Sequence, residues 1–280
     1  MMPFTPKVSV CIPVFNGQET IRETIQSVLN QDFTDFEIVI VDNASTDETV
    51  KIVENFRDDR IRLLRNTVTV PAGENWTKCV QMARGEWTKL LCADDLLTRN
   101  ALLDSLYALE TCPEAIGVVG SRNVINKIGR EVLATRNLHQ YPRLLDHAQL
   151  IKMSLSTGTN PFGETVCVMW KSQLTDRVGG FSSKWNFYID LDYWLRLTLL
   201  GSLVVTPKQV GSFRVTSSSW TSQLGLSALS EAKKFYLAHQ CFARALTRSR
   251  YRALVMAISK IFLRKIFIVV AGHRTVPQAV

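Results

Sequence analysis

Polar and acidic side chains follow three β-rich segments in the first hundred residues. Asn16 comes after the first segment, Asp42 directly after the second, and Asp94 and Asp95 after a later one. In open parallel sheets, ligands bind at the carboxyl ends of the strands, so we expect these side chains to lie at one edge of a sheet. Carboxylate oxygens are natural ligands for Mg²⁺ or Mn²⁺. The pattern therefore predicts a divalent metal site.

The sequence lacks the glycine-rich motifs that bind phosphates through backbone amides. No GxGxxG follows the first β-rich segment, and GxxxxGK[ST] is absent from the chain. A dinucleotide-binding fingerprint and a P-loop are therefore excluded. The charge of a bound diphosphate would instead have to be neutralised by a metal that the acids hold. The six cysteines and four histidines have no metal-ligand spacing, which argues against a zinc site or a disulfide framework.

Strand and helix signals alternate through the first hundred residues. The strands and helices that they predict would position these acids. The expected strands are 8–12, 37–41, 61–64 and 87–91, and the expected helices are 19–29, 45–53 and 75–83. The helices have apolar residues three and four positions apart, and the run 37–41 is typical of a strand buried on both faces. This alternation predicts βαβ units, and hence an α/β fold with a mostly parallel, doubly wound sheet.

The second half of the chain is less regular. We expect strands at 116–120, 165–170 and 203–205, and helices at 144–153 and 190–200. Trp76 and Trp194 have apolar neighbours at helical spacing, so they are expected in the core rather than as sugar platforms. The Ser/Thr-rich stretch 216–227 is the expected boundary. It would separate a catalytic domain over residues 1–225 from a basic, amphipathic helical tail over residues 226–280.

A series of short motifs resembles the family 2 glycosyltransferases, which have the GT-A fold. The motifs are Val8-Ser-Val-Cys-Ile-Pro-Val-Phe-Asn16, Ile40-Val-Asp-Asn-Ala-Ser-Thr-Asp47, Ala83-Arg-Gly-Glu86, Leu90-Leu-Cys-Ala-Asp-Asp95, Val178-Gly-Gly-Phe181, Ile189-Asp-Leu-Asp-Tyr-Trp-Leu-Arg-Leu197 and Phe213-Arg-Val215. Each motif alone has low specificity, but their order and spacing over roughly residues 7–220 are strong evidence. The resemblance implies a single Rossmann-like GT-A domain that transfers sugar from a nucleoside-diphosphate sugar.

The resemblance also implies which residues bind the nucleotide part of the donor. Asp42 is similar to the acid that reads the nucleobase in this family. Pro13, Phe15 and Asn16 would line the same pocket. Glu19 is similar to the acid that follows the first loop and faces the nucleoside.

The same resemblance points to the metal ligands. Asp94 occupies the last position of the family's DxD motif, and Asp95 stands beside it, so both are expected to bind Mn²⁺ or Mg²⁺. Cys92 replaces the first acid of that motif, which puts a contact to the ribose in doubt. Arg214 resembles the basic residue that follows the last core strand in relatives and would contact the nucleotide-sugar, with a plain surface charge as the alternative.

Asp190 is similar to the family's general base. Many relatives have Glu-Asp here, but Ile189 replaces the Glu in this chain. The base would deprotonate an acceptor hydroxyl as it attacks the anomeric carbon from the face opposite the leaving diphosphate, which inverts the configuration. The QxxRW sequence of processive synthases is absent, so we expect transfer of a single sugar to a saccharide or lipid-linked acceptor. Such a reaction belongs to the synthesis of cell-surface polysaccharides or glycolipids.

The acids also have structural alternatives. Asp42 could serve only to cap the following helix, and Asp94 with Asp95 could be a solvated loop at the start of the next helix. Asp190 and Asp192 could both be first-turn acids that the helix dipole favours.

The net charge of +8 is unevenly distributed. Residues 231–280 contain ten Lys and Arg against one Glu, whereas the preceding 230 residues carry a net charge of −1. This division argues against nucleic acid as a partner of the whole protein and favours contact between the tail and an anionic surface. Basic residues beside an apolar stripe suit a helix in the lipid interface. A helix packed on the domain or on a partner chain could have the same sequence pattern.

The expected location is the cytoplasm, with peripheral contact to the inner face of the cell membrane. The start of the chain predicts a strand rather than a signal peptide, and unpaired cysteines suit a reducing compartment.

Two other functions are compatible with paired acids on an α/β domain. A nucleotidyltransferase would also use such a pair, but it usually has an early loop rich in Gly and Arg or Lys, and residues 14–18 contain no basic residue. A non-catalytic nucleotide-sugar-binding module is the second alternative, because Cys92 and Ile189 depart from the family pattern. Turnover of a nucleotide-sugar with Mn²⁺ separates a transferase from this module.

The charge division predicts where lipid affinity resides. Truncation after Ser230 should release the protein from vesicles rich in anionic lipid, because each Lys or Arg near such a surface contributes about 1 kcal/mol. High salt should weaken binding of the intact protein only in part, since salt screens charges but not apolar contacts. Co-sedimentation measures both effects, and equal binding by the full-length and truncated forms would mean that the tail is structural. Transfer to a soluble acceptor should survive truncation if the tail only anchors.

Overall fold

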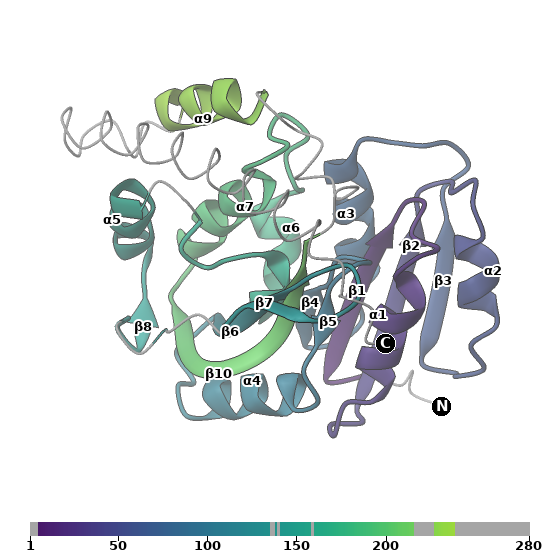
Figure 1. Cartoon of the computed structure of the whole chain (residues 1–280). Coiled ribbons are helices and arrows are strands. Elements are labelled where there is room, and N and C mark those ends of the chain that lie inside the picture. The colour runs from purple at the N-terminus through teal and green to yellow at the C-terminus, as the bar shows by residue number, and fades with distance from the viewer. Residues whose placement is uncertain (1–4, 135–137, 139–140, 158–159, 216–226, 239–280) are drawn as a thin grey trace, which may run out of the picture.

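The computed structural model describes residues 5–134, 138, 141–157, 160–215 and 227–238. A mixed sheet forms its centre, with the strand order β3-β2-β1-β4-β9-β6-β10-β5 (Figure 1). Two further short strands pair off this path, β7 with β6 and β8 with β10. The strands are β1 (Val8–Val14), β2 (Phe36–Asp42), β3 (Ile61–Arg65), β4 (Trp87–Leu90), β5 (Leu96–Leu97), β6 (Gly117–Ile125), β7 (Glu131–Leu133), β8 (Leu144–Leu145), β9 (Val168–Lys171) and β10 (Leu203–Arg214).

The first half of the sheet is parallel, as the alternation of strand and helix signals predicted. β1 pairs with β2 and with β4, and β2 pairs with β3, all in parallel. Every residue of β1, β2 and β4 is buried, as expected for strands covered on both faces. β9 then runs antiparallel between β4 and β6, so the complete sheet is mixed.

Glu37 is a buried acid at the start of β2, and its carboxylate connects neighbouring elements. It accepts hydrogen bonds from the Ser9 hydroxyl at 2.6 Å and from the backbone amide of Arg84 at 2.7 Å. It also lies 2.6 Å from the guanidinium of Arg62 on β3. A buried charge that is paired and hydrogen-bonded in this way is tolerated, and here it ties β1, β2 and β3 to the turn before β4.

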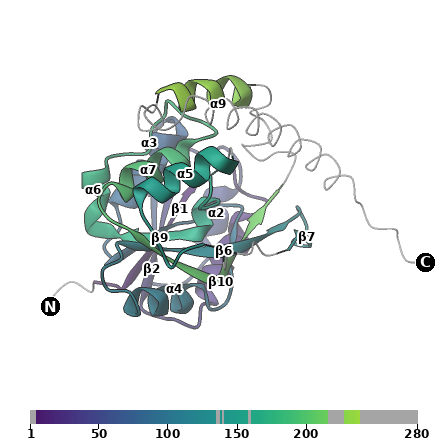
Figure 2. The ribbon, with the colours of Figure 1, turned by 90° about the vertical axis from the view of Figure 1, so that its left-hand side faces the viewer.

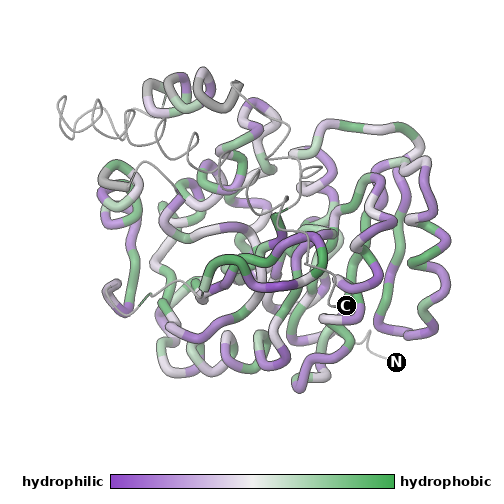
Figure 3. Tube along the Cα trace, in the orientation of Figure 1, coloured by the Kyte–Doolittle hydropathy of each residue, from purple (hydrophilic) through white to green (hydrophobic). Residues whose placement is uncertain are grey.

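Helices cover both faces of the sheet. Figures 1 and 2 show α3, α5, α6 and α7 over one face and α4 beneath the other. Hydrophobic and hydrophilic residues alternate along α4 in Figure 3, as expected for a helix with one face on the sheet. The helices are α1 (Ile21–Leu29), α2 (Thr49–Glu54), α3 (Ala72–Gln81), α4 (Ala101–Glu110), α5 (His147–Thr157), α6 (Thr175–Val178), α7 (Ile189–Thr198) and α9 (Ser227–Ala238).

Three expected elements in the second half differ from the structure. The helix expected at 144–153 begins only at His147, because residues 144–145 form β8 and pair with β10. Residues 165–167 form a 3₁₀ turn rather than a strand, and β9 begins only at Val168. The strand expected at 203–205 continues to Arg214, because the chain resumes pairing with β6 after register shifts between Val205 and Gly211. Pro207 lies in this irregular stretch, where a missing N–H breaks no regular ladder. Such irregularities bend a strand, and Figure 1 shows β10 strongly curved.

The curvature of β10 brings Arg214 beneath the loop that follows β4. Its side chain is fully buried, and its backbone amide donates to Asp95 Oδ1 at 3.0 Å. The guanidinium donates to the carbonyl oxygens of Asp94 and Lys127, both at 2.8 Å, and pairs with Glu23 at 2.6 Å. The surface-charge alternative is therefore wrong. In this arrangement the guanidinium is engaged with protein groups, and its contact with a nucleotide stays a prediction.

The tail begins with a helix that packs on the catalytic body. Ala232, Phe235 and Tyr236 of α9 are buried. The rest of the predicted amphipathic tail, residues 239–280, lies outside the described residues, as does most of the expected boundary at 216–227. Among the helices that the structure describes, none is long and apolar enough to cross a membrane.

The buried guanidinium predicts a loss of stability on substitution. Arg214→Met should lower the free energy of unfolding by on the order of 3 kcal/mol, because buried carbonyl oxygens lose their donors. Arg214→Lys should lower the free energy of unfolding by less, because the lysine ammonium can replace some of the hydrogen bonds that the guanidinium donates. Urea denaturation measures both, with the exposed Arg177→Met as the control. A stable Arg214→Met that binds nucleoside diphosphate poorly would instead identify Arg214 as a ligand contact.

Candidate functional site

The carboxyl ends of β1, β2, β4 and β10 meet at one edge of the sheet. Val14 at the end of β1 lies opposite Asp42 at the end of β2, and Cys11 lies opposite Leu90 at the end of β4. β10 runs in the same direction, because β4 and β6 are both antiparallel to β9 and β10 is parallel to β6. The polar residues that follow these strands therefore face one region, as the sequence predicted.

A hollow of about 110 Å³ lies at this edge. It contains three of the predicted site residues, Asp94, Asp95 and Asp190, although Asp190 is almost a hundred positions further along the chain. The lining residues are Trp76, Cys92, Asp94, Asp95, Glu164, Thr165, Asn186, Phe187, Ile189, Asp190 and Phe213.

Asp94, Asp95 and Cys92 form the most acidic part of the hollow. One ligand atom from each lies within 4.8 Å of the others. Burial raises the pKa of Asp94, and burial together with the nearby charge of Asp94 raises the pKa of Asp95 well above its usual value. Asp95 Oδ2 is buried and has no hydrogen-bond partner among the described residues. An oxygen without a partner, beside a second carboxylate, fits a hard divalent cation. The solvated-loop alternative is wrong for Asp95, which is fully buried.

Asp190 is held in the first turn of α7, where the helix dipole favours a negative charge. Its Oδ1 accepts a hydrogen bond from the backbone amide of Leu191 at 2.7 Å, and its Oδ2 accepts one from the side-chain amide of Asn160 at 3.0 Å. The same Asn160 amide donates to the carbonyl of Gly163 at 2.6 Å. The loop before β9 therefore fixes the orientation of the Asp190 carboxylate within the hollow.

Asp192 has a different environment from Asp190. It is buried, and its carboxylate pairs with Arg196 one turn later at 2.7 Å. Arg196 also donates to the carbonyl oxygens of Val178 and Gly180. Asp192 thus ties α7 to the glycine turn after α6, in line with the structural alternative considered for it, and it does not line the hollow.

The predicted nucleobase acid, Asp42, is fully buried at the end of β2. Its Oδ2 accepts a hydrogen bond from the backbone amide of Ser45 at 3.0 Å and lies 3.3 Å from Arg65 Nε, whereas its Oδ1 has no hydrogen-bond partner among the described residues. Ser45 lies four residues before α2, which begins at Thr49, so this contact holds the turn after β2 and does not cap the helix, contrary to the capping alternative. Contact of Asp42 with a nucleobase stays a prediction.

The other predicted nucleoside residues surround the loop after β1. Pro13 is buried within β1, and the Phe15 ring is 51% exposed. Asn16 has a left-handed backbone (φ 50°), and its side-chain oxygen accepts from the Thr46 amide at 2.9 Å. Glu19 forms an exposed ion pair with Lys127 at 2.9 Å. None of these residues lines the hollow, and their contact with a nucleoside stays a prediction.

Sequence patterns missed several residues of the hollow. Glu164 pairs with Arg122 of β6 at 2.6 Å, across 42 positions of sequence. Burial lowers the pKa of the Arg122 guanidinium, but the charge and hydrogen bonds of Glu164 outweigh burial, so the pKa is raised. Trp76 is partly buried against the core, as expected, but it also lines the hollow, whereas Trp194 is fully buried as expected. No short motif marks Glu164 or Trp76, because their placement depends on pairings between distant segments.

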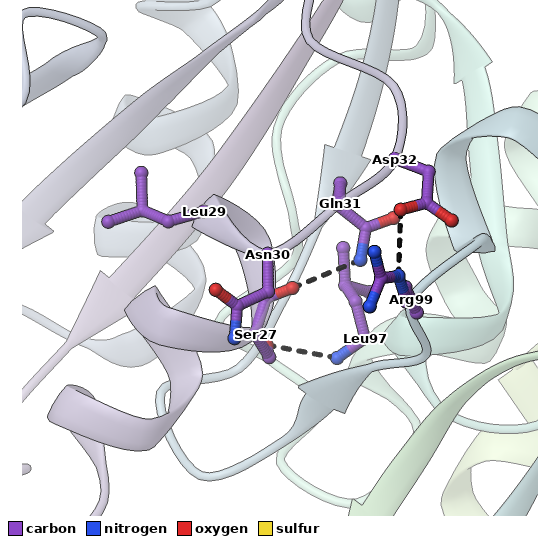
Figure 4. A pocket seen from close by; sticks show the side chains of 7 residues that line it. All are labelled: Ser27, Leu29, Asn30, Gln31, Asp32, Leu97 and Arg99. Atoms are coloured by element: carbon purple, nitrogen blue, oxygen red, sulfur yellow. Dashed lines mark hydrogen bonds and ion pairs between the residues drawn. The ribbon is translucent and has the colours of Figure 1, made fainter.

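A second, larger hollow lies at the C-terminal end of α1, beside β5 (Figure 4). Its polar side chains bind one another: Arg99 pairs with Asp32 at 2.7 Å, and the Ser27 hydroxyl accepts from the Leu97 amide at 3.1 Å. It contains one carboxylate, which already has a counter-ion. The acidic hollow therefore remains the better candidate for chemistry.

Comparison with known sequences matches this chain to one family. The profile of glycosyl transferase family 2 matches residues 9–166. MT1568, an uncharacterized protein of Mycobacterium tuberculosis, is 30% identical over 227 residues, which are 79% of this chain and 71% of that protein. An Escherichia coli protein, the UDP-Glc:alpha-D-GlcNAc-diphosphoundecaprenol beta-1,3-glucosyltransferase WfaP, is 30% identical over 104 residues, 37% of this chain and 41% of that enzyme.

Solved structures of low sequence identity share the fold. Staphylococcus aureus TarS in complex with UDP-GlcNAc superposes with a TM-score of 0.66 at 18% identity, over 93% of this chain and 72% of that chain. The mannosyltransferase PcManGT from Pyrobaculum calidifontis, in complex with GDP-Man and Mn²⁺, gives 0.60 at 17% identity, over 96% and 74%. These likenesses confirm the expected GT-A fold, and the matching profile and the mycobacterial relative show that the chain belongs to glycosyl transferase family 2.

Proposed function

We propose that this glycosyltransferase moves a single sugar, with inversion, from a metal-bound nucleoside-diphosphate sugar to a hydroxyl of a saccharide or lipid-linked acceptor. The observation that supports this proposal most is the presence of Asp94, Asp95 and Asp190 in one hollow. An acid pair suited to a metal and a separate acid suited to proton transfer are the two parts that such a displacement requires.

Asp94 and Asp95 would hold a Mn²⁺ or Mg²⁺ ion, with the Cys92 thiol beside them. Such an ion would stabilise negative charge on the departing diphosphate. The chain's own contribution is to position these two acids. The backbone amide of Arg214 binds Asp95 Oδ1, and the guanidinium holds the Asp94 carbonyl. Arg214 thereby fixes the Asp95 carboxylate and the backbone of Asp94 before the donor binds.

Asp190 would accept the proton of the acceptor hydroxyl. Its carboxylate is restrained on one oxygen by the Leu191 amide and on the other by Asn160, so it needs little reorganisation to meet an acceptor. A single base of this kind serves one-step displacement, in which the acceptor attacks opposite the leaving group. The sugar is transferred once, with inversion.

The relatives suggest the class of acceptor and the setting. WfaP and a Campylobacter jejuni GalNAc(5)-diNAcBac-PP-undecaprenol beta-1,3-glucosyltransferase, 41% identical over 101 residues, both act on undecaprenol-linked sugars by their names. The matched segment is 32% of the Campylobacter enzyme. By analogy, we propose a role in cell-surface polysaccharide or glycolipid synthesis, at the cytoplasmic face of a membrane that the basic tail contacts peripherally.

The proposed metal site predicts the behaviour of one variant. Asp94→Ala should abolish the Mn²⁺-dependent part of nucleoside diphosphate binding and leave the fold intact, because it removes a direct metal ligand. Isothermal titration with and without Mn²⁺ measures this part, and Asp59→Ala, which changes an exposed aspartate, is the matched control. Unchanged Mn²⁺-linked affinity in folded Asp94→Ala would rule out this role.

The proposed base predicts the behaviour of a second variant. Asp190→Asn keeps size and polarity but cannot accept the proton, so turnover should fall by ~10²–10⁴-fold while donor binding is retained. Asp176→Asn, which changes an exposed first-turn acid of α6, controls for a helix-terminal charge. Near-normal turnover of Asp190→Asn would place the base elsewhere. A wild-type protein that binds donors but turns none over would favour the non-catalytic module.

A further inference from the structure

Glu231 of α9 binds three consecutive backbone amides just before α7. Its carboxylate accepts hydrogen bonds from the N–H groups of Asn186 at 2.9 Å, Phe187 at 2.6 Å and Tyr188 at 3.1 Å. More than forty residues of sequence separate donor and acceptor. Glu231 is also the single acid in the otherwise basic stretch 231–280.

These amides belong to the segment that positions the proposed base. The first amides of a helix and of the turn leading into it have no partner within the helix and are usually capped by a nearby side chain. The capping position of α7, Tyr188, makes no side-chain cap hydrogen bond. Glu231 supplies that function from a distant helix. The acidic hollow is lined by Asn186, Phe187 and Asp190, so Glu231 binds the backbone of residues that form its wall.

Aromatic packing holds α9 against the same segment. The ring of Phe235, one turn after Glu231, stacks on Tyr188 with centroids 4.5 Å apart and an interplanar angle of 17°. Trp185 meets Phe235 edge to face at 5.1 Å. Phe235 and Tyr188 are buried. In Figure 1, α9 lies across the top of α7. A hydrophobic interface therefore flanks the carboxylate contacts, of which those to Phe187 and Tyr188 are partly buried and that to Asn186 is exposed.

We propose that Glu231 is a positioning residue, through which α9 holds the segment 186–188 and thereby fixes Asp190 against the metal acids. This inference rests on the proposed role of Asp190. It makes α9 part of the active site, even though no α9 side chain that the structure describes lines the hollow. It also changes the expectation for the tail: truncation after Ser230 removes Glu231 and Phe235, so transfer to a soluble acceptor should not survive it.

The test compares Glu231→Ala and Glu231→Gln with Lys234→Ala, an exposed position on the same helix. Turnover of Glu231→Ala should fall about 10- to 100-fold, since small displacements of a catalytic group have effects of this size. Mn²⁺-linked affinity for nucleoside diphosphate should stay unchanged. Glu231→Gln should lose less, because its amide oxygen can still accept from Phe187 and Tyr188 but its NH₂ group cannot accept from Asn186. Lys234→Ala should match the wild type.

Amide hydrogen exchange gives a readout that is independent of turnover. Residues 186–188 should exchange faster in Glu231→Ala, and Asn186 alone should exchange faster in Glu231→Gln, while β1 and β2 keep their protection. Normal turnover of folded Glu231→Ala, or loss of donor affinity in parallel with turnover, would overturn the positioning role. If Asp190→Asn were fully active while Glu231→Ala was impaired, the proposed base would be wrong, and Glu231 would act on some other group of the same wall.

Discussion

The site depends on holding carboxylates close together where burial opposes their ionisation. Asp95 is completely buried beside Asp94, and the pKa of each is raised because the charged form loses hydration. The Arg214 guanidinium binds the Asp94 carbonyl and Glu23 rather than the two carboxylates. The charges of Arg214 and Arg122 offset burial only in part, so the pKa of both acids stays raised at this edge of the sheet. This arrangement costs stability unless a cation binds there.

The other elements of the fold position side chains at that edge of the sheet. The acids of the first half of the chain follow the parallel strands of the group β1, β2 and β4. The curved β10 places Arg214 beneath these acids. α7 brings the remaining acid from the other half of the chain. Asn160 orients its carboxylate from one side, and Glu231 fixes the preceding segment from the other. The body and the first tail helix therefore form one catalytic unit in this account.

The parts of the fold that depend on local pattern could be predicted from the sequence. The strands at 8–12, 37–41 and 87–91 have continuous β-rich runs, and their parallel pairing follows from the intervening helices. The family motifs also led to Asp94, Asp95 and Asp190, which the fold brings into one hollow.

The remaining features depend on contacts that no local pattern encodes. The length of β10 follows from its pairing with β6 through register shifts. The burial of Arg214 follows from the resulting curvature, and its partner Glu23 lies 191 positions away. Glu231 counted only as one acid in a basic tail, because its three partners are amides of a segment more than forty residues earlier. Charge counting cannot distinguish a docked carboxylate from a solvated one.

The anomeric configuration of the product tests the central claim most directly. Proton NMR during turnover of an α-linked nucleoside-diphosphate sugar, with and without Mn²⁺, reports configuration and metal dependence together. The account predicts a β-linked product that forms only with the divalent ion, because one base acts opposite a leaving group that the metal acids serve. An α-linked product, or equal rates after complete chelation of metal, would contradict it.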